Sequence, residues 1–242
     1  IFTFQRKLLD FLVRLWYNNI MFLHKPPTKD LPPLKAKTSD VGRFYTNLET
    51  NESYPSITTV LGAQSKQGIL EWKKRVGEDV ANHISNQAAT RGTAVHNMVE
   101  DHLNNINVDE VEKYKKQFLP RMMFNVLKPE LTKINNIRLQ EAAMYSSDYT
   151  VAGRVDCIGE YDGVLSVIDF KTSTKEKSED WIENYFIQGS AYSQMYKEHF
   201  GEEVPQIVIL ITTEQGTTQV FKKKPEDYLG KLKDYVEEFY KT

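Results

Sequence analysis

An acid and a lysine stand two positions apart inside an apolar run of the chain. The run is VIDFKTS, residues 167–173, and it carries Asp169 and Lys171. Alternate residues of a strand point to the same face, so a strand here brings the carboxylate and the ammonium group side by side. A mostly buried strand gains no packing from either group, and the pair therefore predicts a polar site.

The residues before this run predict a β-hairpin. Asp162 and Gly163 lie between two strand-like segments. A type I′ turn requires positive φ at both central residues, and Asp-Gly satisfies that requirement. A two-residue loop pairs Tyr161 with Val164. The register of the whole hairpin follows from this pair, provided that neither strand contains a bulge.

This register places Asp156 opposite Asp169, and Arg154 opposite Lys171, on one face. Directly opposed residues have Cβ atoms about 5 Å apart, and like charges there are destabilising. Three arrangements would remove this repulsion: one carboxyl group is protonated, the neighbouring cations neutralise both carboxylates, or a divalent metal ion lies between them. Oxygen ligands favour Mg²⁺, Mn²⁺ or Ca²⁺. An ion-pair cluster without a ligand is the alternative.

Two other segments carry groups able to join this site. Glu141 lies in LQEAAMYS, a predicted strand, where it adds a third carboxylate or is merely solvated. His96 lies in ATRGTAVHNMVEDHL, which we interpret as the opening of a helix, with Arg91 and Thr93 near its start. The positive end of a helix binds phosphate, so Arg91 and Thr93 are candidate phosphate ligands. A lone helical histidine is also compatible with ordinary packing.

A later helix, within residues 178–200, places Gln188 and Tyr192 four positions apart and therefore on one face. Glutamine can hydrogen-bond a phosphate and tyrosine can stack on a base, with a plain amphipathic helix as the alternative. Ser56, in YPSITTVL, is a candidate cap for the helical turn that follows it.

The elements that position these residues are a mixture of helices and strands. Helical periodicity covers about 68–83, 87–105, 109–134, 178–200 and 225–241. Strand-like segments cover 137–146, 150–161, 163–171, 206–213 and 217–223, and a hairpin with a tyrosine at each end precedes the first helix. We therefore expect an α/β fold, with a central mixed β-sheet flanked by helices and a helical lobe at about 68–134.

A single domain is expected over residues 38–242, preceded by an extended Pro-rich arm that ends near residue 37. The segment 1–20 is apolar but too interrupted by charges for a membrane span. It is either an amphipathic or targeting segment, or sequence outside the native protein with Met21 as the true start, and both interpretations stay open.

The amino-acid composition excludes several kinds of site and cofactor. The net charge of the 242 residues is −2, so a nucleic-acid partner must be held by a local patch. Cys157 is the only cysteine, which excludes an internal disulfide and a four-cysteine iron–sulfur cluster. The sequence contains no GxxxxGK[ST] phosphate loop, so no nucleotide cofactor is expected.

Several motifs, taken in order, resemble those of the PD-(D/E)XK nuclease superfamily and its RecB-like branch. They are RGTAVH with His96, GRVD with Asp156, DFK with Asp169 and Lys171, and QGSAY with Gln188 and Tyr192. YPSITTVL and QEAAMYS make the chain most similar to the mitochondrial genome maintenance exonucleases and similar phage exonucleases, over about residues 54–213. The chain departs from the family pattern in two ways: no proline precedes the first acid, and the second acid is aspartate rather than glutamate.

The resemblance implies a restriction-endonuclease-like core and a role for each group. Mg²⁺ or Mn²⁺ would be bound by His96, Asp156, Asp169 and the Phe170 carbonyl. Glu141 would help to hold the metal or its water, and Lys171 would orient or deprotonate the attacking water. The expected substrate contacts are Gln188, Tyr192, Arg91, Thr93, Ser56 and Arg154.

The resemblance also implies a metal-dependent DNA exonuclease that acts on single-stranded ends in replication, repair or recombination. It would work as a monomer, alongside other replication or recombination proteins and away from membranes. Its location would be the cytoplasm of a bacterium or an infected host cell, or the mitochondrial matrix. A structure-specific endonuclease and a non-catalytic nucleic-acid-binding module on the same fold are the alternatives. The polarity of digestion, the choice between DNA and RNA, and the number of metal ions stay open.

Overall fold

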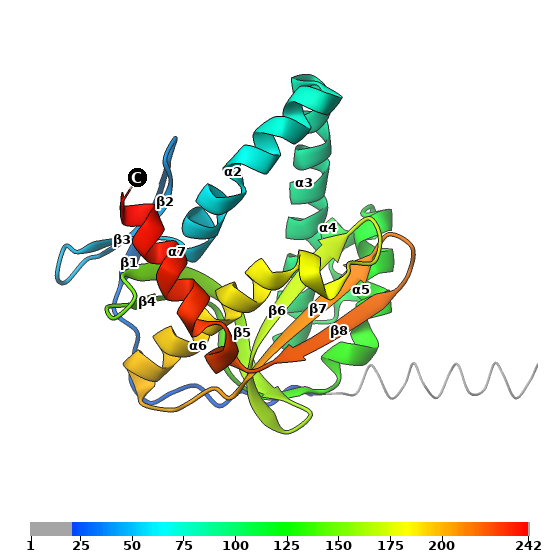
Figure 1. Ribbon diagram of the computed structural model, residues 1–242. Coiled ribbons are helices and arrows are strands. Elements are labelled where there is room, and N and C mark those ends of the chain that lie inside the picture. The colour runs from blue at the N-terminus through cyan, green and yellow to red at the C-terminus, as the bar shows by residue number, and fades with distance from the viewer. Residues whose placement is uncertain (1–20, 242) are drawn as a thin grey trace, which may run out of the picture.

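The structure is a computed structural model that describes residues 21–241, and the expectations for segment 1–20 lie outside these residues. The strands are β1 (Leu34–Ser39), β2 (Gly42–Asn47), β3 (Ser53–Pro55), β4 (Ile134–Ser146), β5 (Val151–Tyr161), β6 (Val164–Ser173), β7 (Gln206–Thr213) and β8 (Thr218–Lys223). The helices are α2 (Ile57–Val76), α3 (Glu78–Leu103), α4 (Glu112–Lys115), α5 (Phe118–Leu131), α6 (Glu183–Phe200) and α7 (Leu229–Lys241), with 3₁₀ turns at Val108–Glu110, Glu179–Trp181 and Pro225–Asp227. Figure 1 shows their arrangement.

The central sheet has five strands in the order β4-β5-β6-β7-β8. Strands β6 and β7 are parallel, and the other neighbours are antiparallel. A parallel pair needs a crossover connection, which α6 supplies. The predicted fold class, a mixed sheet flanked by helices, is confirmed.

Helices cover both faces of this sheet (Figure 1). On one face α3 and α5 pack against a cluster that includes Ile168 and Phe170. On the other face α2, α6 and α7 pack against a cluster that includes Val167. A strand buried on both faces is apolar at nearly every position. Asp169 and Lys171 interrupt this pattern on the α6 side, where Lys171 contacts Gln188 and Tyr185 of that helix.

The β5–β6 hairpin is confirmed in its turn and in most of its register. Tyr161 pairs with Val164, and the turn residues Asp162 and Gly163 have φ of 51° and 80°. The predicted register continues as far as the pair Cys157–Ile168.

Beyond that pair the two strands separate. The Asp156 carboxylate accepts a hydrogen bond from the Phe170 N–H at 3.0 Å, and β6 stays paired with β7 on its other edge. The expected position of Arg154 opposite Lys171 is therefore wrong. Arg154 keeps only its partner on the other side of β5, Ala143 of β4.

Strand β4 is irregular at two points. Its register against β5 shifts between Asn135 and Leu139, where Asn136 has a φ of 46°. Glu141 has a φ of 48°, a left-handed conformation that is uncommon for residues other than glycine and asparagine. Its neighbours Gln140 and Ala142 pair with Cys157 and Val155, so Glu141 lies opposite Asp156.

The helical boundaries differ from those predicted. Helix α2 begins just after Ser56, whose side chain accepts a hydrogen bond from Thr59 N–H, so the predicted cap is confirmed. The break expected between residues 83 and 87 is wrong, since it falls at Gly77, whose φ of 90° suits glycine. Helices α2 and α3 project from the sheet as a hairpin (Figure 1).

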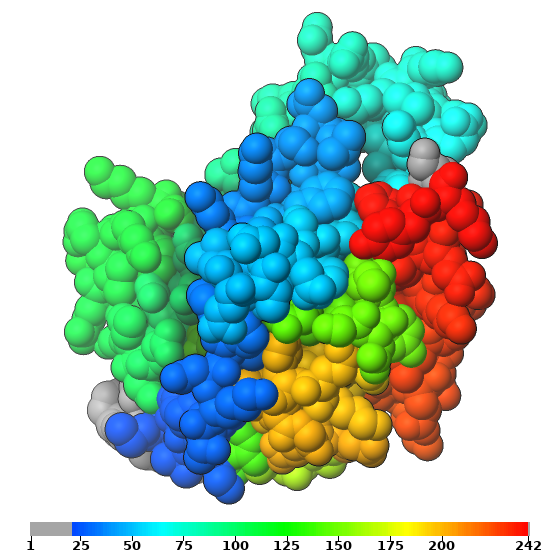
Figure 2. All heavy atoms as spheres, turned by 90° about the vertical axis from the view of Figure 1, so that its left-hand side faces the viewer, coloured from blue at the N-terminus to red at the C-terminus, as the bar shows by residue number. Residues whose placement is uncertain are grey.

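The Pro-rich arm is part of the fold. Phe22 is buried against the ring of His102, and both polar groups of the Asn105 side chain hydrogen-bond the backbone of Phe22. The arm was expected to run to residue 37, but β1 already begins at Leu34 and pairs with β2. The arm and the small sheet β1-β2-β3 lie together on one face of the molecule (Figure 2). Among residues 21–241, no helix has the length and apolar character needed to cross a membrane.

Candidate active site

A cleft of about 460 Å³ opens where α3, α6, β4, β5 and the small sheet meet. Its walls combine polar side chains from distant parts of the sequence. The lining residues are Arg43, Tyr45, Ser56, Thr58, Gly92, Thr93, His96, Asn97, Glu100, Glu141, Gly153, Arg154, Asp156, Gln188 and Tyr192.

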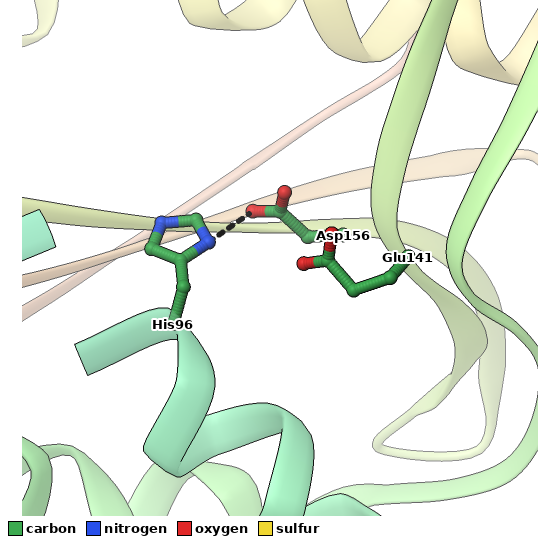
Figure 3. Close-up of side chains that lie close together, drawn as sticks. All are labelled: His96, Glu141 and Asp156. Atoms are coloured by element: carbon green, nitrogen blue, oxygen red, sulfur yellow. Dashed lines mark ion pairs between the residues drawn. The ribbon is translucent and has the colours of Figure 1, made fainter. Parts of the chain in front are cut away.

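Three of these residues could hold a metal ion. One ligand atom from each of His96, Glu141 and Asp156 lies within 4.8 Å of the other two (Figure 3). His96 reaches the strands from α3, and its Nδ1 lies 3.5 Å from Oδ2 of Asp156. The two carboxylates are hard oxygen ligands that suit Mg²⁺ or Mn²⁺, and the imidazole nitrogen is a borderline ligand.

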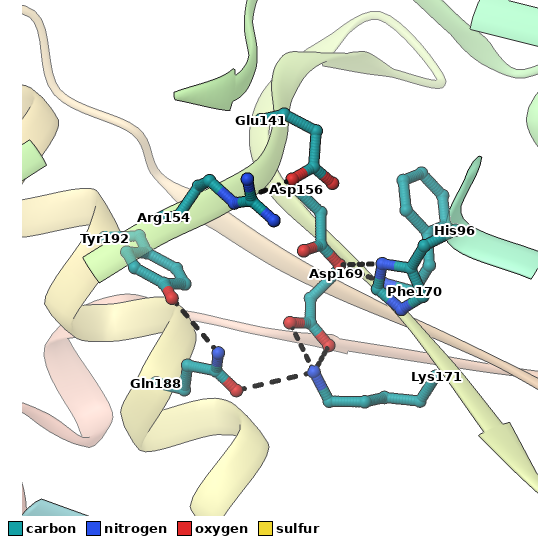
Figure 4. Close-up of polar contacts among 9 residues, drawn as sticks. All are labelled: His96, Glu141, Arg154, Asp156, Asp169, Phe170, Lys171, Gln188 and Tyr192. Atoms are coloured by element: carbon teal, nitrogen blue, oxygen red, sulfur yellow. Dashed lines mark hydrogen bonds and ion pairs between the residues drawn. The ribbon is translucent and has the colours of Figure 1, made fainter. Parts of the chain in front are cut away.

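Asp169 and Lys171 form a close pair beside this cluster (Figure 4). Asp169 is 1% exposed, and the Lys171 ammonium donates a hydrogen bond of 2.6 Å to its Oδ1. The same ammonium lies 2.5 Å from Oδ2, but outside hydrogen-bond geometry, so this buried oxygen accepts no hydrogen bond from any described residue. The ammonium group thus contacts both carboxylate oxygens, and Asp169 pairs with Lys171 and does not belong to the group of His96, Glu141 and Asp156.

The electrostatics of the pair follow from its burial. Burial raises the pKa of Asp169 to about 6, although Lys171 acts in the opposite direction. Burial also opposes the charge of Lys171, but the carboxylates of Asp169 and Asp156 outweigh it and raise the pKa of the ammonium group. Lys171 is therefore a persistent cation next to a group of acids.

Glu141 is also partly buried next to another carboxylate. Burial and the negative charge of Asp156 raise the pKa of Glu141. Arg154, whose Nε lies 3.0 Å from the Glu141 carboxylate, partly offsets this effect. Like charges held together at half-buried positions are stabilised by a cation between them, and a divalent ion meets this need.

Gln188 and Tyr192 continue the polar network from Lys171. The Gln188 carbonyl oxygen accepts from Lys171 at 3.4 Å, and its amide donates to the Tyr192 hydroxyl at 3.2 Å (Figure 4). The Tyr192 ring packs over Gly153, where a Cβ atom would lie 2.7 Å from the ring. Tyr192 is 2% exposed, so its ring has no open face for the base stacking considered above.

The other expected substrate contacts have different surroundings. Thr93 lines the cleft, and so does Ser56, which bridges to Ala152 of β5. Arg91 and Thr93 do not lie near a helix start, because α3 begins at Glu78, and the phosphate argument based on a helix end is wrong. The Arg91 side chain is held by Glu214 and by Thr172.

Several residues of the cleft were not predicted from the sequence. Asn97 and Glu100 follow His96 on the same helix, so helical spacing from the RGTAVH motif could have indicated both. Arg43 and Tyr45 come from the small sheet, and the sequence has no local signal that this sheet packs against β5.

Comparison with known protein families assigns the chain to a class of nucleases. Residues 66–241 match the PD-(D/E)XK nuclease superfamily, and the chain belongs to this superfamily. This membership confirms the predicted family and a hydrolase of the nuclease class.

Particular relatives are exonucleases by name. The chain is similar to mitochondrial genome maintenance exonuclease 1 of Homo sapiens, 28% identical over 131 residues, 51% of this chain and 38% of that protein. The enzyme of the same name from Xenopus tropicalis is 30% identical over 139 residues, which are 54% of this chain and 39% of that protein. The one from Mus musculus is 26% identical over 207 residues, which are 76% of this chain and 60% of that protein. The chain thus spans less than two thirds of the length of these relatives. An exonuclease candidate from Eubacterium rectale has a solved structure with a TM-score of 0.44, 13% identity, and coverage of 63% of this chain and 66% of its own.

Proposed function

We propose that this chain is a metal-dependent DNA exonuclease that hydrolyses phosphodiester bonds at single-stranded ends. The observation that carries the proposal is the grouping of His96, Glu141 and Asp156 beside the buried pair of Asp169 and Lys171. A protein that only binds DNA has no need for acids at the floor of its cleft, because they repel phosphate.

Each group has a chemical task in this proposal. Phosphodiester hydrolysis needs a nucleophilic water, charge neutralisation at the phosphate and a stabilised leaving group. A bound Mg²⁺ or Mn²⁺ lowers the pKa of water and neutralises phosphate charge. His96, Glu141 and Asp156 would hold that ion, and the resemblance to the family adds Asp169 as a further ligand. The Lys171 ammonium would orient the attacking water and stabilise the negative charge that develops on the phosphate.

Exonuclease action on single strands rests on two supports. The relatives named above are exonucleases of mitochondrial genome maintenance, which favours DNA as the substrate and a role in replication, repair or recombination. The cleft, of about 460 Å³, is in the size range of small-molecule sites and can admit the end of one strand.

The test is digestion of end-labelled single-stranded DNA with Mg²⁺, with Mn²⁺ and with EDTA. Wild type is compared with Asp156→Asn and Lys171→Met, and with Asp162→Asn as a matched control. Asp162 lies in the turn of the same hairpin and pairs with Lys222 at the surface, so its substitution leaves the cleft intact. We expect metal-dependent shortening in wild type and in the control, and its loss in the other two variants.

Circular single-stranded DNA, duplex DNA and single-stranded RNA complete the design. A circle lacks ends, so cleavage of the circle would replace the exonuclease with an endonuclease. Binding of DNA that is insensitive to EDTA, without cleavage, would overturn the enzymatic proposal and leave a binding module. The label that disappears first gives the polarity of digestion.

A further inference from the structure

One arginine at the rim of the cleft has no acidic partner among residues 21–241. The cleft is lined by two arginines, Arg43 and Arg154. Arg154 forms an ion pair with Glu141. The Arg43 guanidinium instead donates one hydrogen bond, from Nε to the hydroxyl of Thr38 at 3.3 Å, and forms no ion pair within residues 21–241. Arg43 is exposed, so its Nη groups are available to a ligand.

The backbone of Arg43 is nevertheless held firmly in place. Its N–H donates to the Thr59 hydroxyl at 2.9 Å, and its carbonyl accepts from Ser56 N–H at 2.8 Å. The adjacent Gly42 lies so close to α2 that a Cβ atom would be 2.3 Å from Thr59. The small sheet is thus fixed to the first turn of α2, and Arg43 has a defined position at the rim.

The acidic residues around the cleft indicate what a cation at this position can do. Glu100, Glu141 and Asp156 line the cleft, and each repels a phosphate backbone. The metal and Lys171 can compensate this repulsion at the scissile phosphate, but not at its neighbours along the strand. A further cation that lines the cleft can do so, and arginine suits the task because its paired N–H groups match the oxygens of a phosphate.

We propose that Arg43 binds a backbone phosphate of the nucleic-acid strand, next to the scissile one, and thereby positions the strand in the cleft. This inference rests on the proposed function, since it assigns the substrate contacts of the same site. The small sheet β1-β2-β3 is then the substrate-binding wall of the cleft, and the strands β4, β5 and β6 carry the catalytic groups.

The test compares Arg43→Ala and Arg43→Lys with Lys37→Ala. Lys37 is a matched control, because it is an exposed cation of the same sheet, one strand away, and does not line the cleft. The readouts are KM and kcat for a single-stranded oligonucleotide with Mn²⁺, and its Kd by fluorescence anisotropy in EDTA over a range of salt concentrations.

Arg43→Ala should raise KM and Kd about tenfold, as expected for one charge-assisted hydrogen-bonded contact, and leave kcat within about twofold. The slope of log Kd against log salt should fall by about 0.7, the value for one phosphate contact on a single strand. Arg43→Lys should retain that slope and recover part of the affinity, and Lys37→Ala should match wild type.

If Arg43→Ala has the same Kd and the same salt slope as Lys37→Ala, the Arg43 proposal is overturned. Cleavage by wild type would still support the proposed nuclease activity. A loss of kcat with unchanged KM would also overturn it, since Arg43 would then act on the catalytic groups. If wild type binds the oligonucleotide without cutting it, the proposed exonuclease activity is contradicted. The Kd values of the Arg43 variants would still test whether Arg43 binds a phosphate.

Discussion

The carboxylate of Asp156 accepts the backbone N–H of Phe170, with Oδ2 3.0 Å from the nitrogen. The backbone ladder between β5 and β6 ends one step earlier, at the pair Cys157–Ile168. The same oxygen faces Nδ1 of His96 at 3.5 Å. Asp156 therefore closes the gap between two separating strands and also belongs to the candidate metal site.

This double role predicts that Asp156→Ala and Asp156→Asn differ in stability. Both should lose cleavage, because each removes a charged ligand. Asp156→Ala also leaves the Phe170 N–H without its acceptor, which costs about 1–3 kcal/mol, whereas the amide oxygen of asparagine can replace it. Urea unfolding in EDTA measures the difference. Equal midpoints for the two variants would show that the hydrogen bond contributes little.

Much of the fold could be predicted because its signals are local. The turn at Asp162 and Gly163 sets the β5–β6 register by backbone conformation alone. The apolar runs of β6 and β7 mark strands buried on both faces. The candidate site residues of the hairpin followed from these signals.

The remainder depends on contacts between distant segments. Beyond the pair Cys157–Ile168, β5 stays paired with β4 and β6 with β7 while the two strands separate, and no residue of the hairpin reveals this. The small sheet brings Arg43 to the cleft through hydrogen bonds to α2. The left-handed conformation of Glu141 is likewise set by packing, since glutamate has no preference for it.

Glu141→Gly should stabilise the metal-free protein, by about 1 kcal/mol, because glycine adopts a φ of 48° without strain. The lost ion pair with Arg154 weighs little against this gain, since the arginine side chain is 58% exposed. The same substitution should weaken Mn²⁺ binding, as measured by calorimetry. Glu141→Gln is the control, because it removes the charge and keeps the strain. A lower urea midpoint for Glu141→Gly than for Glu141→Gln would contradict the prediction.

Asp169 and Lys171 should be strongly coupled in stability. Asp169→Asn leaves the Lys171 ammonium without its partner at a mostly buried position, which costs about 3 kcal/mol or more, and Lys171→Met removes the cation that favours the charged form of the buried Asp169. The double variant removes both charges and should lose less than the sum of the two. A double-mutant cycle by urea unfolding in EDTA gives the coupling, and strictly additive losses would mean that the two charges are independently solvated.

A histidine away from the cleft should make the fold sensitive to acid. His102 lies between the rings of Phe22 and Phe124, at centroid distances of 5.1 and 5.5 Å. Burial, and then the positive charge of Lys128, lower the pKa of His102 from 6.5 to about 4, and Asp109 acts weakly in the opposite direction. The neutral ring is thus the form that the folded protein favours.

The direction of the pH effect follows from this lowered pKa. Between about 4 and 6.5 the unfolded chain binds a proton that the folded chain does not, so the free energy of unfolding falls as the pH falls. The full contribution is present above pH 6.5 and amounts to at most about 3 kcal/mol. Urea midpoints at pH 7 and pH 5 should therefore differ more for wild type than for His102→Gln. His83→Gln, on an exposed position of the same helix, should behave like wild type. If His102→Gln retained the pH dependence of wild type, other groups would have to account for the acid sensitivity.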